Sequence, residues 1–147
     1  MPQIKAHDEI LLKTPIDELW KILVDIPNYQ KWWPKVVNLK IVKYNPEFIG
    51  SEFKANPLGG KSFACRVIST LLKKEIQLEY FGGIYKGIGS WKIEENVGIV
   101  KVSYSVDLEI VDKSIAFLSK IISIPKLHSM IFKRILSGLE KELKSKN

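Results

Sequence analysis

The spacing of hydrophobic residues along the sequence changes near the C-terminal end of the chain, at Asp112. Before it, residues 99–110 alternate between apolar and polar side chains, as a strand with one buried and one exposed face does. After it, apolar residues recur at helical spacing almost to the C-terminus. A long helix with one apolar face needs a large apolar partner, and a sheet is the partner that this chain offers. The change of period therefore predicts a sheet with a long C-terminal helix packed across it.

The C-terminal tail contains one residue that a continuous helix tolerates poorly, Pro125. A proline inside a helix removes one backbone hydrogen bond and clashes with the preceding turn, at a cost of roughly 3 kcal/mol. The tail is therefore predicted to form two helical pieces. The apolar face of the second piece is expected to contain Leu127, Met130, Ile131, Ile135, Leu139 and Leu143.

Short strand-like runs separated by turn residues fill most of the chain before this tail. The expected strands are residues 3–13, 36–44, 51–55, 63–72, 75–81, 84–94 and 99–110. Glycine, proline and asparagine occupy the breaks between them, for example at residues 57–60 and 82–83. Connections this short predict an antiparallel meander.

A turn at residues 96–98 would join the last two strands as a hairpin. In that hairpin, Gly87, Gly89 and Trp91 lie opposite the apolar face of the last strand. The two glycines would leave room for the large rings of Trp91 and Tyr104. Because glycines inside a strand commonly mark a sharp bend, they also predict strong curvature.

Thr14 and Pro15 separate the first strand from a short helical region. Thr14 is expected to cap a helix whose first residue is Pro15, and this helix should end near residues 25–27. Residues 28–34 are aromatic and end in a proline, so they are expected to form a single helical turn.

The length of 147 residues predicts a single domain, residues 1–147. The N-terminus does not resemble a secretory signal, and no apolar run reaches the roughly 18–20 residues that a bilayer span needs. We therefore expect a cytoplasmic protein without a transmembrane segment. Both a monomer and a dimer agree with the sequence.

The sequence offers little for a metal or a nucleic acid. Cys65 is the single cysteine and His7 and His128 are the two histidines, so no Cys/His cluster is expected, and neither is a metal or a cofactor. The net charge of +7 comes from lysines scattered along the chain, and they do not interleave with aromatic residues as in a base-stacking surface. They predict solvated faces rather than a specific nucleic-acid site.

Three segments and the tail together resemble a known family. They are ILLKTPIDELWKILVD at residues 10–25, NYQKWWP at residues 28–34 and GIGSWKI at residues 87–93. In this order they are similar to the polyketide cyclase/dehydrase and lipid-transport proteins of the START-related (SRPBCC, birch-pollen-allergen-like) superfamily. The resemblance implies an α+β helix-grip fold, in which a seven-stranded curved antiparallel sheet wraps around a long C-terminal helix. It also implies two short helices after the first strand, and a cavity between sheet and helix.

Strand parity and helical spacing assign residues to the two walls of such a cavity. The inner wall of the sheet is expected to consist of Phe63, Val67, Leu78, Tyr80, Tyr85, Trp91, Val102, Tyr104 and Val106. The helical side is expected to consist of Ile124, Leu127, His128 and Ile131. Small residues at the inward positions 65, 87 and 89 make such an enclosure harder to fill completely.

Tyr29, Trp32 and Trp33 are candidates for the mouth of the cavity or for a transient contact with a membrane surface. The alternative is that they pack the short helix beneath the long one, which we expect for at least one of the two tryptophans.

The function that this pattern favours is the binding or transport of a hydrophobic small molecule, such as a lipid, a quinone or a polyketide-like compound. One alternative is a cyclase or dehydrase in which His128 or Asp8 acts as general base and Tyr104 or Tyr80 polarises a carbonyl. A second is an interaction protein, like family members associated with ribosomes or respiratory quinones. In the alternation of its strand Arg66 falls on the outward face, which favours a surface role for it.

Overall fold

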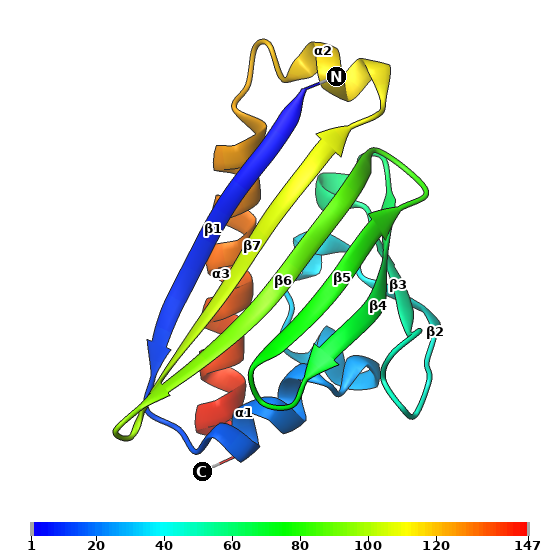
Figure 1. Cartoon of the computed structure of the whole chain (residues 1–147). Helices are drawn as coiled ribbons and strands as arrows, with labels where there is room; N and C mark the ends of the chain where they lie inside the picture. Colours follow the sequence, from blue (N-terminus) through cyan, green and yellow to red (C-terminus); the bar gives the residue numbers. More distant parts are fainter. Residues whose placement is uncertain (1, 147) are drawn as a thin grey trace.

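The computed structural model describes residues 2–146, which form one antiparallel sheet and a long helix lying across it (Figure 1). The seven strands occur in the order β1-β7-β6-β5-β4-β3-β2. Their bounds are β1 (Gln3–Leu12), β2 (Lys40–Lys43), β3 (Glu52–Ala55), β4 (Phe63–Leu71), β5 (Glu75–Phe81), β6 (Tyr85–Asn96) and β7 (Ile99–Ile110). The helices are α1 (Ile16–Leu23), α2 (Lys113–Leu118) and α3 (Ile124–Ser145), with short 3₁₀ turns η1 (Ile26–Lys31), η2 (Lys35–Val37) and η3 (Pro57–Gly59).

The β6–β7 hairpin has the register that the sequence predicts. Trp91 pairs with Tyr104, and Gly89 pairs with Val106. The turn between the strands places Val97 and Gly98 at φ values of 41° and 79°, the left-handed region that tight hairpins use. The apolar side of β7 therefore meets the apolar side of β6, and both face α3.

The two glycines of β6 are required for different physical reasons. A Cβ at Gly89 would overlap the hydroxyl of Tyr104 and lie 2.8 Å from Cε1 of Tyr80, so this glycine leaves room for ring atoms, as expected. Gly87 has a φ of 149°, and a Cβ there would overlap the backbone carbonyl of Asp107 on β7. The expectation that Gly87 makes room for Trp91 and Tyr104 is therefore wrong, because the close neighbour is backbone.

The C-terminal tail breaks where the sequence predicts, between α2 and α3. Pro125 lies in the first turn of α3, where its missing N–H removes no helical bond. Ser123 caps this helix by accepting a hydrogen bond from the backbone N–H of Lys126 at 3.4 Å.

The buried face of α3 is rotated relative to the expected one. Ile135, Leu139 and Leu143 are buried as expected, whereas Met130 is exposed. Phe132 and Leu136 are buried instead. The difference arises because the sheet contacts a side of the helix slightly off the stripe that spacing alone defines.

The segment between β1 and β3 departs most from the predicted elements. Pro15 is the N-cap of α1, with ψ at 137°, so Thr14 does not cap this helix. The expected strand at residues 36–44 is shorter, because residues 35–37 form η2 and Asn38 adopts a left-handed φ of 52°. A left-handed residue cannot continue a strand, and β2 therefore begins at Lys40.

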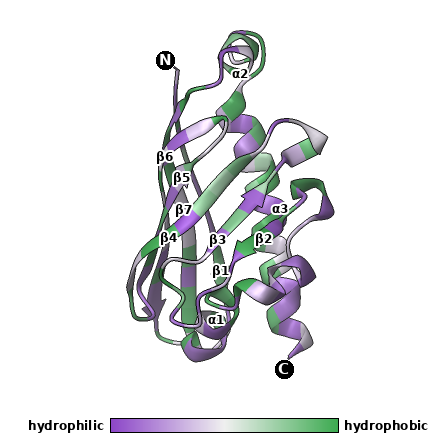
Figure 2. Cartoon of the chain, turned by 90° about the vertical axis from the view of Figure 1, so that its right-hand side faces the viewer, coloured by the Kyte–Doolittle hydropathy of each residue, from purple (hydrophilic) through white to green (hydrophobic). Residues whose placement is uncertain are grey.

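The two ends of the molecule carry different elements. α2 and the start of α3 lie at the end where β7 finishes, and α1 lies at the other end, beside the last turns of α3 (Figure 1). Seen from the side, α3 runs along one face of the sheet (Figure 2). At Gly138 a Cβ would overlap the backbone carbonyl of Trp32, so this glycine lets α3 approach the end of η1 closely.

None of the helices within residues 2–146 combines the length and the apolar character needed to cross a bilayer.

Candidate functional site

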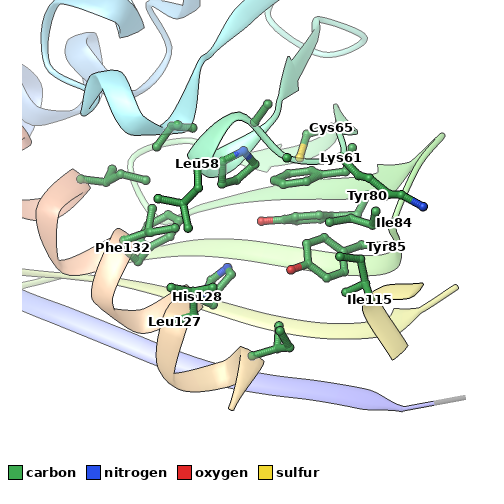
Figure 3. Close-up of a pocket in the computed structure, with 18 of the residues that line it drawn as sticks. Leu58, Lys61, Cys65, Tyr80, Ile84, Tyr85, Ile115, Leu127, His128 and Phe132 are labelled. Carbon is green, nitrogen blue, oxygen red and sulfur yellow. The ribbon is translucent and has the colours of Figure 1, made fainter. Parts of the chain in front are cut away.

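An apolar cavity of about 250 Å³ lies between the sheet and the first half of α3. Strands β3 to β7 form one wall, and η2, η3, the β5–β6 turn, α2 and α3 contribute to the others (Figure 3). The sheet side is lined by Phe53, Ala55, Phe63, Cys65, Leu78, Tyr80, Tyr85, Trp91 and Tyr104. The other sides are lined by Trp33, Val37, Pro57, Leu58, Gly60, Lys61, Ile84, Ile115, Leu118, Ile124, Leu127, His128, Ile131, Phe132 and Ile135.

A stacked aromatic group connects α3 to the sheet at this cavity. The rings of Phe132 and Tyr104 are nearly parallel, at an interplanar angle of 3° and a centroid distance of 4.1 Å. Trp91 packs against both, at centroid distances of 5.5 Å from Phe132 and 5.0 Å from Tyr104. Large rigid rings that contact one another hold the helix at a distance from the sheet.

Two tyrosine hydroxyls form the polar part of the sheet wall. The hydroxyls of Tyr80 and Tyr104 are 2.6 Å apart, which is a hydrogen bond in which either oxygen acts as donor. Burial raises the pKa of both tyrosines well above the ordinary value, so both stay protonated. In such a pair one hydroxyl proton is used within the pair and the other is free to point elsewhere.

His128 faces these tyrosines from α3. Its ring lies nearly parallel to that of Tyr104, at a centroid distance of 6.5 Å. Its Nδ1 atom is buried and has no hydrogen-bond partner within residues 2–146. Burial lowers the pKa of His128 to about 4, against a smaller opposing effect of the Asp8 charge. At neutral pH the ring is therefore uncharged, and Nδ1 is an unsatisfied group beside an apolar cavity (Figure 3).

The other polar candidates do not join this group. Asp8 is buried on β1 and accepts a hydrogen bond from the hydroxyl of Ser129 at 3.0 Å, and its side chain is not part of the cavity lining. Arg66 points outward as expected, toward Glu52 at 3.4 Å and Glu79 at 3.2 Å. Asp8 is therefore held by a structural partner, and Arg66 belongs to the outer face of the sheet.

Most of the residues that parity placed on the cavity walls line the cavity. They are Phe63, Leu78, Tyr80, Tyr85, Trp91, Tyr104, Ile124, Leu127, His128 and Ile131. Val67, Val102 and Val106 are buried in the core and are not part of the lining. The reason for this correction is that parity identifies the face of a strand, but not whether other side chains separate a residue from the open space.

Of the aromatic residues at positions 29–33, two pack in the core and one lines the cavity. Tyr29 and Trp32 are buried, and the Tyr29 hydroxyl donates to the backbone carbonyl of Leu23. Tyr29 also stacks on Trp33 at a centroid distance of 5.4 Å. Trp33 borders the cavity and stays a candidate for its mouth, whereas Tyr29 and Trp32 are packing residues, as expected for at least one of the two tryptophans.

Several residues on the more exposed side of the cavity, where it opens to solvent, were not predicted from the sequence. They come from η3, with Leu58 exposed in a left-handed conformation, and from the inward side of α2, with Ile115 and Leu118. Phe132 was also missed, although it lies one helical turn after His128 and therefore shares its face. The spacing contained the signal for Phe132, whereas the loop residues join the site only through the fold.

No group of three His, Cys, Asp or Glu side chains suited to a metal ion occurs within residues 2–146. Cys65 is a buried free thiol whose pKa is raised by burial, with a smaller opposing effect of a hydrogen bond with Tyr80.

Comparison with known proteins supports the fold and identifies a family match. The family model described as polyketide cyclase/dehydrase and lipid transport matches residues 12–131. A search of curated proteins found no match.

Several solved structures share the architecture at low identity. A START superfamily protein from Mycobacterium smegmatis is 13% identical, with a TM-score of 0.72 over 97% of this chain and 99% of that chain. Ginseng major latex-like protein 151 from Panax ginseng is 11% identical, with a TM-score of 0.73 over 96% and 97% of the two chains. Zhui aromatase/cyclase from Streptomyces sp. R1128 is 12% identical, with a TM-score of 0.69 over 97% and 94%. The expected helix-grip fold is confirmed.

Proposed function

This chain belongs to the polyketide cyclase/dehydrase and lipid-transport family, and on that premise we propose that it binds a small hydrophobic molecule in the cavity between the sheet and α3. The observation that carries the proposal is the enclosed apolar space itself. A well-packed core leaves few voids larger than a water molecule. A space of about 250 Å³ walled by aromatic and aliphatic side chains is therefore larger than the voids that ordinary packing leaves, and it offers room for an apolar ligand.

The size and lining of the cavity restrict the ligand. Its volume is just below the roughly 300–1,000 Å³ of common small-molecule sites. The proposed ligand is therefore compact, or it is the end of a longer lipid, quinone or polyketide-like molecule that extends through the opening. Removing apolar ligand surface from water contributes roughly 25 cal/mol per Å².

The polar groups of the cavity give the ligand a preferred orientation. His128 Nδ1 accepts from a ligand hydroxyl or donates to a ligand carbonyl, according to the tautomer of the ring. The free proton of the Tyr80–Tyr104 pair offers a donor on the opposite wall. We therefore propose an apolar ligand with one hydroxyl or carbonyl group, because that group would form a hydrogen bond with the unpartnered Nδ1 of His128.

The proposal is tested by blocking the cavity from α3. Ile131 lines the cavity, while its neighbour Met130 is exposed to solvent. Ile131→Phe should weaken binding of the dye anilinonaphthalene sulfonate by roughly tenfold, or about 1.4 kcal/mol, whereas the matched control Met130→Phe should bind like the wild type. Fluorescence titration measures both, and displacement of the dye by long-chain alcohols and ketones tests the ligand class.

A dye that binds all three proteins equally would contradict the proposal. So would a wild-type protein that binds none of the dye, the alcohols and the ketones.

A cyclase-type reaction is the second candidate, and the observation that favours it is that His128 and the tyrosine pair face the same cavity. A neutral imidazole can accept a proton from the carbon next to a carbonyl group, which gives an enolate. Neutral tyrosine hydroxyls can then stabilise the enolate oxygen by hydrogen bonding. In this mechanism His128 would act alone as base, because Asp8 bonds to Ser129.

Turnover of a linear polyketide analogue distinguishes the two candidates. For a cyclase, His128→Gln and Tyr104→Phe should each abolish product formation while the analogue still binds. Wild-type rates in both variants would remove these residues from the reaction.

A further inference from the structure

The segment between α2 and α3 exposes a cluster of large apolar side chains at one end of the molecule. Phe117, Ile121 and Ile122 are 64%, 72% and 45% exposed. These three residues, here called the α2–α3 patch, lie within six consecutive positions. In Figure 2 this connection projects at the end of the molecule and contains hydrophobic stretches. Single exposed apolar residues are ordinary, but a contiguous group marks a contact surface.

The charged residues nearest the patch in the sequence are mainly lysines. Lys113, Lys120 and Lys126 are exposed, and no ion pair involves them within residues 2–146. Between residues 110 and 139 Asp112 is the single acidic side chain. Its carboxylate is occupied, because it pairs with Lys61 at 2.8 Å and caps the N-terminus of α2. A partner of the patch therefore meets apolar surface surrounded by unpaired positive charge.

The inner side of the same segment belongs to the cavity. Leu118 and Ile124 line the cavity, while the intervening Ile121 and Ile122 face outward. A surface that covers the patch is therefore next to the exposed side of the cavity, which α2, η3 and the start of α3 line. Leu58 of η3 is also exposed and lines the same side of the cavity, whereas the β4–β5 and β6–β7 turns lie at the far end of the molecule (Figure 1).

We propose that the α2–α3 patch docks on an anionic membrane surface, with its apolar side chains in the interface and its lysines at the lipid headgroups. The chemistry of the patch selects this partner, because a bilayer surface combines negative headgroups with an apolar layer immediately below them. A ligand would then pass between the bilayer and the cavity without crossing open water. This purpose rests on the proposed ligand-binding function, whereas the docking itself does not.

Flotation with two kinds of vesicle tests the docking. The full chain should bind vesicles of equal parts phosphatidylcholine and phosphatidylserine, bind phosphatidylcholine vesicles more weakly, and dissociate as salt is added. The variant Phe117→Ser/Ile121→Ser/Ile122→Ser should bind the anionic vesicles at least about tenfold more weakly. Because all three side chains are exposed, this variant should remain folded, which circular dichroism checks.

A matched control removes the same number of exposed apolar residues at the far end. Leu71 ends β4, Leu72 lies in the β4–β5 turn and Val97 lies in the β6–β7 turn, and all three are exposed. The variant Leu71→Ser/Leu72→Ser/Val97→Ser should bind the anionic vesicles like the wild type. An equal loss in both triple variants would overturn the assignment of the docking surface.

A second pair of variants tests the electrostatic contribution of the lysines to vesicle binding. Replacing Lys113, Lys120 and Lys126 by Gln should weaken binding roughly fivefold for each lysine. Replacing Lys74, Lys92 and Lys141 by Gln changes the net charge by the same amount away from the patch, and should have a much smaller effect. Equal losses would mean a general charge attraction and would overturn the proposal.

Dye binding in the cavity separates the outcomes for the two proposals. Loss of vesicle binding with intact dye binding in the patch variant supports docking as a separate property. A wild-type protein that binds the dye but no vesicle overturns the docking proposal alone, and one that binds vesicles but no dye overturns the cavity proposal alone.

Discussion

The two halves of α3 face the same sheet and are packed differently. The first half, from Ile124 to Phe132, borders the cavity, and Leu127, His128 and Ile131 remain partly accessible along it. In the second half Leu136, Leu139 and Leu143 are buried in the continuous core. The first half places the rings of His128 and Phe132 against aromatic residues of the sheet, whereas leucines predominate in the second half.

This difference separates a ligand-binding role from a stabilising role along one helix. Leucines adapt to their neighbours and fill a core closely, whereas stacked rings fix a distance that the smaller side chains around them do not fill. The end near α1 is therefore expected to carry most of the stability, and the end near α2 most of the function. Four changes test this division.

The largest effect is expected from Leu139→Ala in the second half. Leu139 is fully buried, and truncating such a leucine leaves a cavity that the surroundings fill only in part. The free energy of unfolding should fall by about 2–5 kcal/mol. Urea denaturation measures it, with the exposed Met130→Ala as a control, and a loss below about 1 kcal/mol would show that this half is not tightly packed.

Acid should destabilise the protein through His128 in the first half. The pKa of this side chain is lowered from 6.5 to about 4 in the folded protein. As the pH falls from 6.5 toward 4, the unfolded chain takes up a proton that the folded protein does not, so stability decreases over this window. The loss attributable to His128 is on the order of 3 kcal/mol and is complete below pH 4.

Carboxylates also titrate in acid, so the measurement compares variants. The pH profile of unfolding for His128→Gln should lack this loss, while His7→Gln, at the exposed histidine, should retain it. Identical profiles for the wild type and His128→Gln would show that the histidine is solvated.

Gly89→Ala tests the tyrosine wall of the cavity. The added Cβ would overlap the Tyr104 hydroxyl, and the rings of Tyr104 and Tyr80 would have to shift. We expect a loss of about 1–3 kcal/mol in stability together with weaker dye binding. Gly60→Ala, whose Cβ would have an ordinary contact of 3.4 Å with the carbonyl oxygen of Pro57, serves as the control for stability alone, because Gly60 also lines the cavity. Equal stabilities would show that the cavity absorbs the shift freely.

The smallest effect on stability is expected from Leu127→Ala in the first half. Leu127 is only partly buried and already borders open space, so its truncation enlarges an existing cavity. The free energy of unfolding should fall by about 1 kcal/mol or less. Dye affinity should change more than stability does. A loss as large as that of Leu139→Ala would remove the distinction between the two halves.

The local parts of this fold follow from the sequence because their rules are local. The register of the β6–β7 hairpin follows from alternation and a tight turn, and both extend over only a few residues. The break before α3 follows from the geometry of Pro125. The same rules were insufficient for residues 35–38, where a left-handed Asn38 ends the expected strand early.

The candidate site was predicted in part for the same reason. Alternation identified the inward face of β5 and β6, and with it Tyr80 and Trp91. It did not distinguish Val102 and Val106, which face the same way and are covered by the core. It also missed Leu58, because the turn residues around it indicate a loop but not what that loop covers.

The sequence by itself determined which faces are apolar, where the chain turns, and that a single helix must lie across a curved sheet. Only the tertiary structure decided that a space remains between them. Its size depends on the height of α3 above the sheet, which is set by contacts between distant segments: Phe132 on Tyr104 at 4.1 Å, and Gly138 against the backbone of Trp32. A periodic pattern records the direction of a side chain but not the distance to its partner, and that distance leaves room for a ligand.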